Sequence, residues 1–238
     1  MFFIALVLGC KQEHKPDADF IINKSIEVSG GKCFENSVIS FDFRSKHYKA
    51  IRSKNKFQYE RQFKDTLGVV KDVLKNNEFA RFVNNAVFNI TEERANAYSN
   101  SVNAVHYFSV LPYGLNDKAV NKTYLGEKNI QGKTYYKIKI TFEEIGGGED
   151  FEDVFVYWID SKTFKMDYLA YSYQEKDGIG YRFREAFNER YVNSLRFVDF
   201  NNFKPKHVNV KLEDLDILFE KEALKLLSKI EIENIKVN

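Results

Sequence analysis

The sequence contains little cysteine and proline, no long apolar run and no excess of charge of one sign. Its 238 residues include 2 cysteines and 3 prolines, and its 34 acidic residues nearly balance its 36 basic residues. It has no apolar run of the roughly 18 residues that would indicate a membrane-spanning helix. The charges are interspersed rather than clustered, so the sequence lacks the basic patches of nucleic-acid-binding proteins, and we expect no nucleic-acid partner.

The sequence also lacks the common catalytic and cofactor-binding motifs. It has no nucleophile elbow, zinc motif or dinucleotide fingerprint, and we expect no cofactor. The glycine run 146–148 is not a phosphate-binding loop, because no Lys-Ser or Lys-Thr pair follows it and a predicted strand comes next. These absences make a binding protein a better hypothesis than an enzyme.

Acidic residues follow the glycine run and are the candidates for a metal site in this sequence. Carboxylates at close spacing suit a hard cation such as Ca²⁺, although the EF-hand spacing is absent. A solvated loop tip is the alternative interpretation. The weak candidate ligands are Glu149, Asp150 and Asp153.

Aromatic residues are abundant and favour a mainly β fold. They make up 16% of the chain, with 22 Phe and 14 Tyr, and such residues pack well on the pleated surface of a sheet. Alternating apolar positions predict strands over 38–44, 47–52, 57–64, 69–74, 79–83, 123–128, 134–142, 154–159, 163–174, 181–191, 195–203 and 223–237. Helical spacing predicts helices over 17–28 and from Thr91 to about Ser109, and 212–219 as a loop or a short helix. Without a repeat or a linker, we predict a single domain.

The N-terminus has the pattern of a bacterial lipoprotein signal. Residues 1–9 are apolar, Cys10 follows a small residue, and the chain becomes polar immediately afterwards. We predict a truncated signal peptide over 1–9, lipidation of Cys10, a tether up to residue 16 and the folded domain over 17–238. The lipid would anchor the protein in the cell envelope, on the periplasmic face of a membrane or on the outer surface. A buried first strand with an incidental cysteine is the alternative.

Cys33 is the other cysteine. If Cys10 is lipidated, Cys33 has no partner within the chain for a disulfide. No histidine or acid lies nearby at the spacing of an activated nucleophile, so we predict a small buried thiol.

The strand after the glycine run is apolar on both faces. Val154, Val156 and Trp158 alternate with an equally apolar set, so both faces should be covered. The preceding strand is predicted to face inward through alternate apolar residues, with Lys137 and Lys139 pointing outward. These patterns predict a strongly curved antiparallel sheet, an open half-barrel, with helices on its concave face, an arrangement that often leaves a cavity.

Four segments resemble those of a Bacteroidota lipoprotein family with a domain of unknown function. They are 111–120, 146–158, 167–173 and 182–186, and the resemblance covers about residues 17–236. The order of strands and helices is in turn similar to that of the LolA/LolB-like lipoprotein carriers. This second resemblance implies an open half-barrel with helices in its mouth and a hydrophobic pocket for acyl chains or a similar ligand.

We therefore predict a lipid-anchored envelope protein that binds a lipid or another hydrophobic small molecule, with an envelope protein partner left open. The expected ligand contacts are His106, Tyr113, Tyr157, Trp158, Tyr168, Tyr171, Phe183 and Glu185. For His106, a structural role through a hydrogen bond is the alternative. A purely structural surface lipoprotein is another interpretation.

An enzyme is the competing hypothesis. Asp150 or Asp153 would act as a base near His106 and Glu185, and the positive charge of Arg182 or Arg184 would stabilise negative charge. This hypothesis requires these groups to converge within hydrogen-bonding distance.

Overall fold

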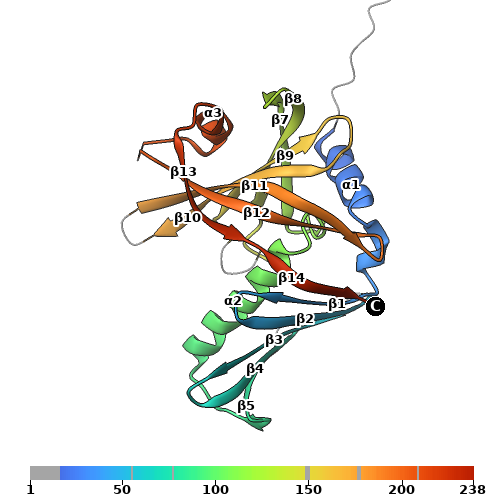
Figure 1. Cartoon of the computed structure of the whole chain (residues 1–238), viewed down its shortest axis with the longest axis vertical. Coiled ribbons are helices and arrows are strands. Elements are labelled where there is room, and N and C mark those ends of the chain that lie inside the picture. The colour runs from blue at the N-terminus through green and yellow to red at the C-terminus, as the bar shows by residue number, and fades with distance from the viewer. Residues whose placement is uncertain (1–16, 55, 77, 148–150, 176–177, 208) are drawn as a thin grey trace, which may run out of the picture.

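The protein is built from two antiparallel sheets and three α-helices (Figure 1). The computed structural model describes residues 17–54, 56–76, 78–147, 151–175, 178–207 and 209–238. Each sheet has seven strands, and neither closes into a barrel. The mainly β, open half-barrel fold predicted from the sequence is confirmed.

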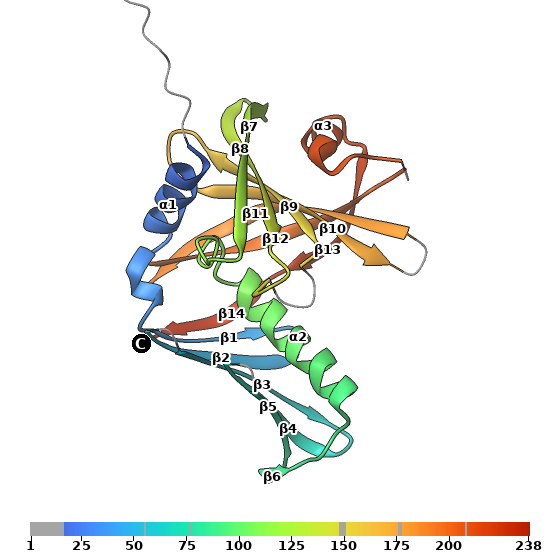
Figure 2. The same cartoon turned by 180° about the vertical axis from the view of Figure 1, so that it is seen from behind.

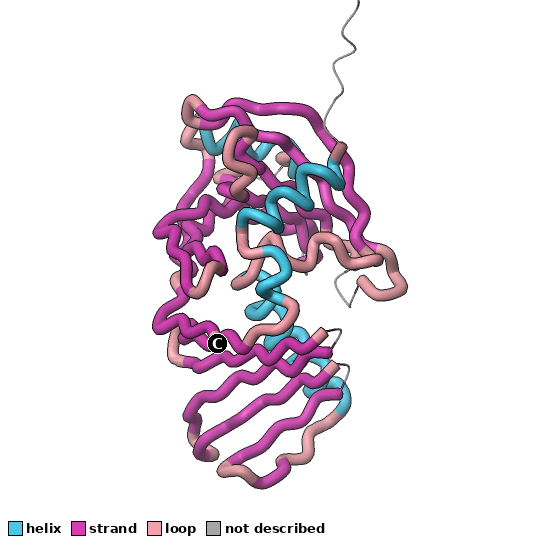
Figure 3. The backbone as a smooth tube through the Cα atoms, turned by 90° about the vertical axis from the view of Figure 1, so that its right-hand side faces the viewer, coloured by secondary structure: helices cyan, strands magenta, loops and turns pink. Residues whose placement is uncertain are grey.

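The first sheet contains the early strands and the last strand of the chain, in the order β14-β1-β2-β3-β4-β5-β6. It forms the lower part of the molecule in Figure 3. Consecutive strands pair as hairpins, as the short spacing between them predicts. The strands are β1 (Val38–Phe43), β2 (Lys46–Ser53), β3 (Lys56–Asp65), β4 (Gly68–Lys75), β5 (Glu78–Val83), β6 (Ala86–Val87) and β14 (Ile232–Val237).

The second sheet is a meander in the order β13-β12-β11-β10-β9-β8-β7. Its hairpin turns include Gln131-Gly132 and Asn193-Ser194, in which both residues have positive φ angles. Such turns match the right-handed twist of the flanking strands. The strands are β7 (Val120–Ile130), β8 (Lys133–Phe142), β9 (Val154–Asp160), β10 (Met166–Glu175), β11 (Gly178–Val192), β12 (Leu195–Pro205) and β13 (Leu224–Ile230).

The two longer helices begin at the capping residues that the sequence indicates. The Asp17 side chain accepts a hydrogen bond from the Asp19 N–H, and the Thr91 side chain accepts one from the Arg94 N–H. Within the described residues, no helix is long and apolar enough to cross a membrane. The helices are α1 (Ala18–Val28), α2 (Glu92–Phe108) and α3 (Leu215–Glu220), with short 3₁₀ turns η1 (Gly31–Phe34) and η2 (Leu212–Asp214).

The larger core lies between the two sheets, on the side that we call the concave face. Inward residues of the first sheet, such as Phe41, share this core with Tyr157 and Ile138 of the second sheet. Ile21 and Ile22 of α1 complete it, and α2 crosses the face of the first sheet (Figure 2). One continuous apolar core therefore holds the two sheets together.

A smaller core lies on the opposite face of the second sheet, which we call the outer face. Trp158, Tyr168 and Phe183 pack there against Leu212 and Leu215 of η2 and α3. Both faces of β9 are thus covered, as its two-sided apolar pattern predicts. The expectation that all helices pack on the concave face is wrong for α3.

The last predicted strand, 223–237, is divided between the two sheets. β13 pairs with β12, and after the single residue Glu231 the chain continues as β14, which pairs with β1. In Figure 1 this segment runs from one sheet to the other. Apolar residues recur through both halves, so the sequence pattern does not reveal the change of partner.

One prediction about a single side chain, that of a buried Cys33, is wrong, and the burial of Lys137 was not predicted. Cys33 is exposed in η1, because the apolar contact of this turn is made by the neighbouring Phe34. Lys137 is on the outer face as predicted, but only 4% of it is exposed because η2 and α3 cover it. Its ammonium lies 3.3 Å from an Asp216 carboxylate oxygen, which compensates its buried charge.

All the described strands, helices and both cores lie within residues 17–238. A chain that begins at Lys11 therefore contains every described strand and helix and both cores, and it suits binding experiments.

Candidate functional site

The last turn of α2 lies between the two sheets and contacts both. His106 packs on the first sheet, and its ring stacks on Tyr59 with centroids 4.6 Å apart. Phe108 contacts Phe43 of β1 edge-on at 5.5 Å, and the guanidinium carbon of Arg184 on β11 lies 5.4 Å from its ring centroid. This turn is the centre of the concave face.

His106 is fully buried and held by one hydrogen bond. Its Nε2–H donates to the Glu60 carbonyl oxygen at 3.1 Å, and its Nδ1 has no partner among the described residues. Burial lowers the pKa of His106 to about 3, partly opposed by the hydrogen bond to Glu60, so the ring is neutral at physiological pH. His106 thus makes the hydrogen bond that the structural interpretation requires.

The second-sheet side of the concave face is aromatic. The Tyr157 ring is fully buried in β9, next to Phe155, which stacks on Tyr171 at 5.4 Å. Arg184 Nη2 donates to the Tyr171 hydroxyl at 3.0 Å. Burial raises the pKa of Tyr157 well above its usual value, so its hydroxyl stays protonated in this apolar setting.

Tyr113 closes one end of the concave face. It belongs to the 109–119 loop, whose Val110, Leu111 and Leu115 are buried, so the loop is ordered as the sequence predicts. The Tyr113 ring stacks on Phe34 of η1 at 4.7 Å.

Arg52 lies beneath Tyr113. Its guanidinium carbon is 5.8 Å from the Tyr113 ring centroid and 5.1 Å from that of Tyr59. Two aromatic rings therefore flank a positive charge at the end of β2.

The eight predicted ligand contacts do not form one site. His106, Tyr113, Tyr157 and Tyr171 face the concave side. The other four lie on the outer face: Trp158, Tyr168, Phe183 and Glu185.

The outer-face residues are held by structural contacts. The Trp158 indole donates to Asp216 at 3.3 Å, and Phe183 stacks on Phe219 at 4.9 Å. Glu185 accepts a hydrogen bond from Asn201 at 3.0 Å. Since the sheet separates them from the concave side, one ligand cannot contact both groups.

The groups required by the enzyme hypothesis are also separated. His106 faces the first sheet on the concave side, whereas Glu185 lies on the outer face of the second. Glu149 and Asp150 lie outside the described residues, and Asp153 lies within them. The described part of the chain contains no cluster of three or more His, Cys, Asp or Glu side chains that could hold a metal.

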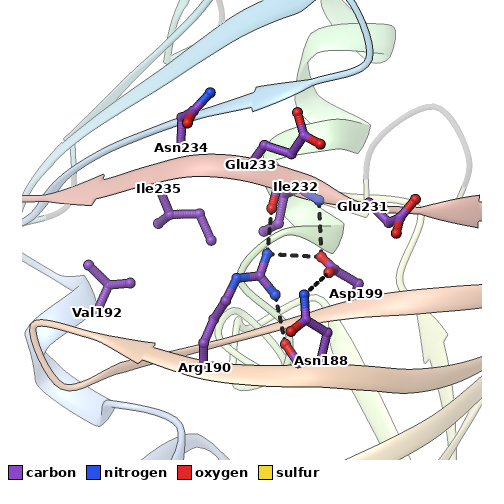
Figure 4. Close-up of a pocket in the computed structure, with 9 residues that line it drawn as sticks. All are labelled: Asn188, Arg190, Val192, Asp199, Glu231, Ile232, Glu233, Asn234 and Ile235. Carbon is purple, nitrogen blue, oxygen red and sulfur yellow. Dashed lines mark hydrogen bonds and ion pairs between the residues drawn. The ribbon is translucent and has the colours of Figure 1, made fainter.

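Two polar clefts lie outside the apolar centre of the concave face. One, of about 310 Å³, lies where the sheets part (Figure 4) and is lined by residues that include Arg190, Asp199 and Ile232. The other, of about 550 Å³, lies at the turn between β1 and β2 and includes Lys46 and Phe63. The concave centre itself is filled by side chains such as Tyr157, so a ligand there requires a covering element to move.

The sequence matches a known family along nearly its whole length. Residues 1–234 match the family of unknown function DUF6503. The chain belongs to this family. No curated protein matches the sequence of this chain.

The fold of this DUF6503 member is similar to solved structures at low sequence identity. A LolA superfamily protein from Nitrosomonas europaea shares 9% identity, with 93% of this chain and 94% of that chain covered and a TM-score of 0.53. A domain described as an outer membrane lipoprotein-sorting protein, from Vibrio parahaemolyticus, shares 7% identity over 91% and 93% of the two chains, with a TM-score of 0.44. The first similarity confirms the predicted LolA-like fold.

Sequence reasoning missed Arg52 and Tyr59 as residues of this site. The available signal was strand alternation, because Tyr48, Ala50 and Arg52 occupy successive inward positions of β2. An arginine in an apolar row is unusual and would have marked the position.

Proposed function

We propose that this protein binds an apolar ligand, a lipid or an acyl chain, on its concave face beneath α2 and the 109–119 loop. The LolA-like fold supports this proposal, because an open half-barrel with helices across its mouth provides a sheltered apolar surface. The aromatic lining supports it as well. Tyr157 and Tyr171 are the proposed contacts on the second sheet, and His106 and Tyr113 on the covering elements.

The observation that carries the proposal is the small number of residues that α2 buries against the surface it covers. Of its 17 residues, α2 buries only Val102, Val105 and His106. Two buried valines hold the helix with about 1.5–3 kcal/mol each, which is little for a helix of this length. An apolar ligand can replace so small a contact at low cost.

The contacts of α2 with the first sheet also include polar ones, beside aromatic contacts such as that of Phe108. Arg61 Nη1 donates to the Ser101 hydroxyl at 2.8 Å, and the guanidinium carbon of Arg81 lies 3.6 Å from the Tyr98 ring centroid. Water can satisfy these groups when α2 moves away, whereas an apolar helix face would resist exposure. The helix is therefore suited to open and close over the sheet.

The predicted lipoprotein anchor completes the proposal. Lipidation at Cys10, followed by the polar residues 11–16, would place the domain at a membrane surface of the cell envelope, close to a source of acyl chains.

Native mass spectrometry of the chain from Lys11 onward, purified from a bacterial host, tests the proposal. We expect a co-purifying fatty acid or lipid, identified after organic extraction, and saturable binding of a fluorescent fatty acid by the delipidated protein. Binding should also change hydrogen exchange in α2 but not in α3, which lies on the outer face and serves as the internal control.

A protein that purifies empty and binds no apolar probe would refute ligand binding and favour a purely structural lipoprotein. Binding that alters exchange in α3 and leaves α2 unchanged would instead place the ligand on the outer face.

A further inference from the structure

Arg52 differs from the other buried arginines because no carboxylate among the described residues pairs with its charge. Arg61 binds Asp72 at 2.6 and 3.0 Å. Arg196 forms ion pairs with Glu189 and Asp167. Arg52 is only 6% exposed, yet among the described residues no carboxylate lies within ion-pair distance of it.

Two of the three guanidinium nitrogens of Arg52 have no hydrogen-bond partner among the described residues. Nη2 makes a long contact of 3.5 Å with the Tyr59 hydroxyl, whereas Nε and Nη1 have no partner within the described part of the chain. A buried charged group without partners is costly, and native structures normally compensate it with an opposite charge or a bound molecule. The described residues provide the cation and leave its counter-anion to be supplied by a bound molecule.

The surroundings of Arg52 favour an oxyanion at the end of an apolar molecule. The Tyr59 and Tyr113 rings lie near the guanidinium, whose N–H groups without a partner among the described residues suit a carboxylate or phosphate. Tyr59 also stacks on His106, so Arg52 borders the aromatic centre of the concave face.

We propose that Arg52 binds the anionic head group of the ligand, a carboxylate or phosphate attached to an acyl chain, while the chain lies along the concave face. This inference rests on the proposed function and adds the charge and the orientation of the ligand. The head group would lie at the Tyr113 end and the acyl chain would point towards Tyr157.

The test compares ligands that share their acyl chains and differ in the charge of the head group. Oleic acid and methyl oleate, measured by displacement of a fluorescent fatty acid, isolate the carboxylate. Phosphatidylglycerol and diacylglycerol, measured by native mass spectrometry, isolate the phosphate. We expect the wild-type protein to prefer the charged member of at least one pair by about tenfold, the change that one charge-assisted contact produces.

Arg52→Gln should reduce this preference to about one, and Arg52→Lys should retain part of it. Arg44→Gln is the matched control, because it removes the same charge from an exposed position in the turn at the other end of β2. As a check on folding, Arg52→Gln should not lower Tm, since it removes an uncompensated buried charge.

The outcomes separate the two proposals. If neither member of either pair binds, the proposed function itself fails. If charged and neutral members bind equally well, or if Arg52→Gln keeps the wild-type preference, apolar binding stands and the role of Arg52 is refuted. If only the fatty-acid pair or only the phospholipid pair shows the preference, that pair identifies the head group.

Discussion

At the scale of single residues, burial sets the charge of His106. Its pKa is lowered to about 3 by burial, whereas an unfolded chain gives histidine a pKa near 6.5. The folded state therefore binds fewer protons than the unfolded state between these values. The stabilisation from a neutral His106 is complete above about pH 6.5 and is lost as the pH falls towards 3.

We predict that the free energy of unfolding falls by about 2 kcal/mol between pH 7.5 and pH 5 because of His106 alone. His106→Leu should remove this part of the pH dependence, measured by denaturant unfolding at both values. His207→Gln, at an exposed histidine, is the control and should behave as the wild type. The same loss of stability in wild type and His106→Leu would contradict the buried, neutral state.

The sequence predicted the roles of some single residues and missed those of others. The hydrogen-bonded role of His106 followed from its place at the apolar edge of a helix. Burial of Lys137 did not, because it depends on η2 and α3, which come from a segment more than seventy residues later in the chain. Arg52 was missed for a similar reason, since its significance depends on Tyr113 and on the lack of a nearby carboxylate in the part of the chain that the structure describes.

At the scale of elements, Asp72 organises the surface on which α2 lies. The carboxylate is fully buried and accepts hydrogen bonds from Arg61 and Arg81. The same two arginines contact Ser101 and Tyr98 of α2, so one carboxylate positions both side chains that hold the helix.

We predict that Asp72→Asn destabilises the protein by about 3–5 kcal/mol, because it leaves the buried Arg61 and the partly buried Arg81 without their counter-charge. Hydrogen exchange in α2 should accelerate more than in α1, which lacks these contacts. Glu78→Gln, at an exposed acid of β5, is the control and should leave both measurements unchanged. Normal α2 exchange in a folded Asp72→Asn variant would show that the arginines do not hold the helix.

Most elements were predictable because local spacing determines them. The caps at Asp17 and Thr91, the short hairpin turns and the two-sided apolar pattern of β9 all lie within the sequence that forms the element. The sequence did not predict which neighbouring strand each strand pairs with. Apolar residues recur through both β13 and β14, and only the assembled sheets show which neighbour each strand pairs with.

At the scale of the whole molecule, Asp199 joins the two sheets where the chain passes from one to the other. Its carboxylate accepts hydrogen bonds from the Ile232 N–H at 3.0 Å and from Arg190 at 2.9 Å. Arg190 also donates to the Ile232 carbonyl oxygen, as Figure 4 shows. These side chains satisfy backbone groups of Ile232 at the point where β14 begins its pairing with the first sheet.

The final prediction concerns this junction. Asp199→Asn removes the charge that pairs with Arg190 and places amide hydrogens opposite existing donors. It should cost about 3 kcal/mol, less than a fully buried pair because Arg190 is partly exposed. Calorimetry should show Tm lowered by about 6–12 °C. Glu231→Gln, at an exposed acid beside the same cleft, is the control.

Unfolding of this variant should remain a single transition, because the core between the sheets is shared and neither sheet can keep its apolar face buried alone. Two separate transitions would show that the sheets fold independently. An unchanged Tm would show that packing in the shared core, rather than Asp199, sets the junction between the two sheets that enclose the proposed ligand site.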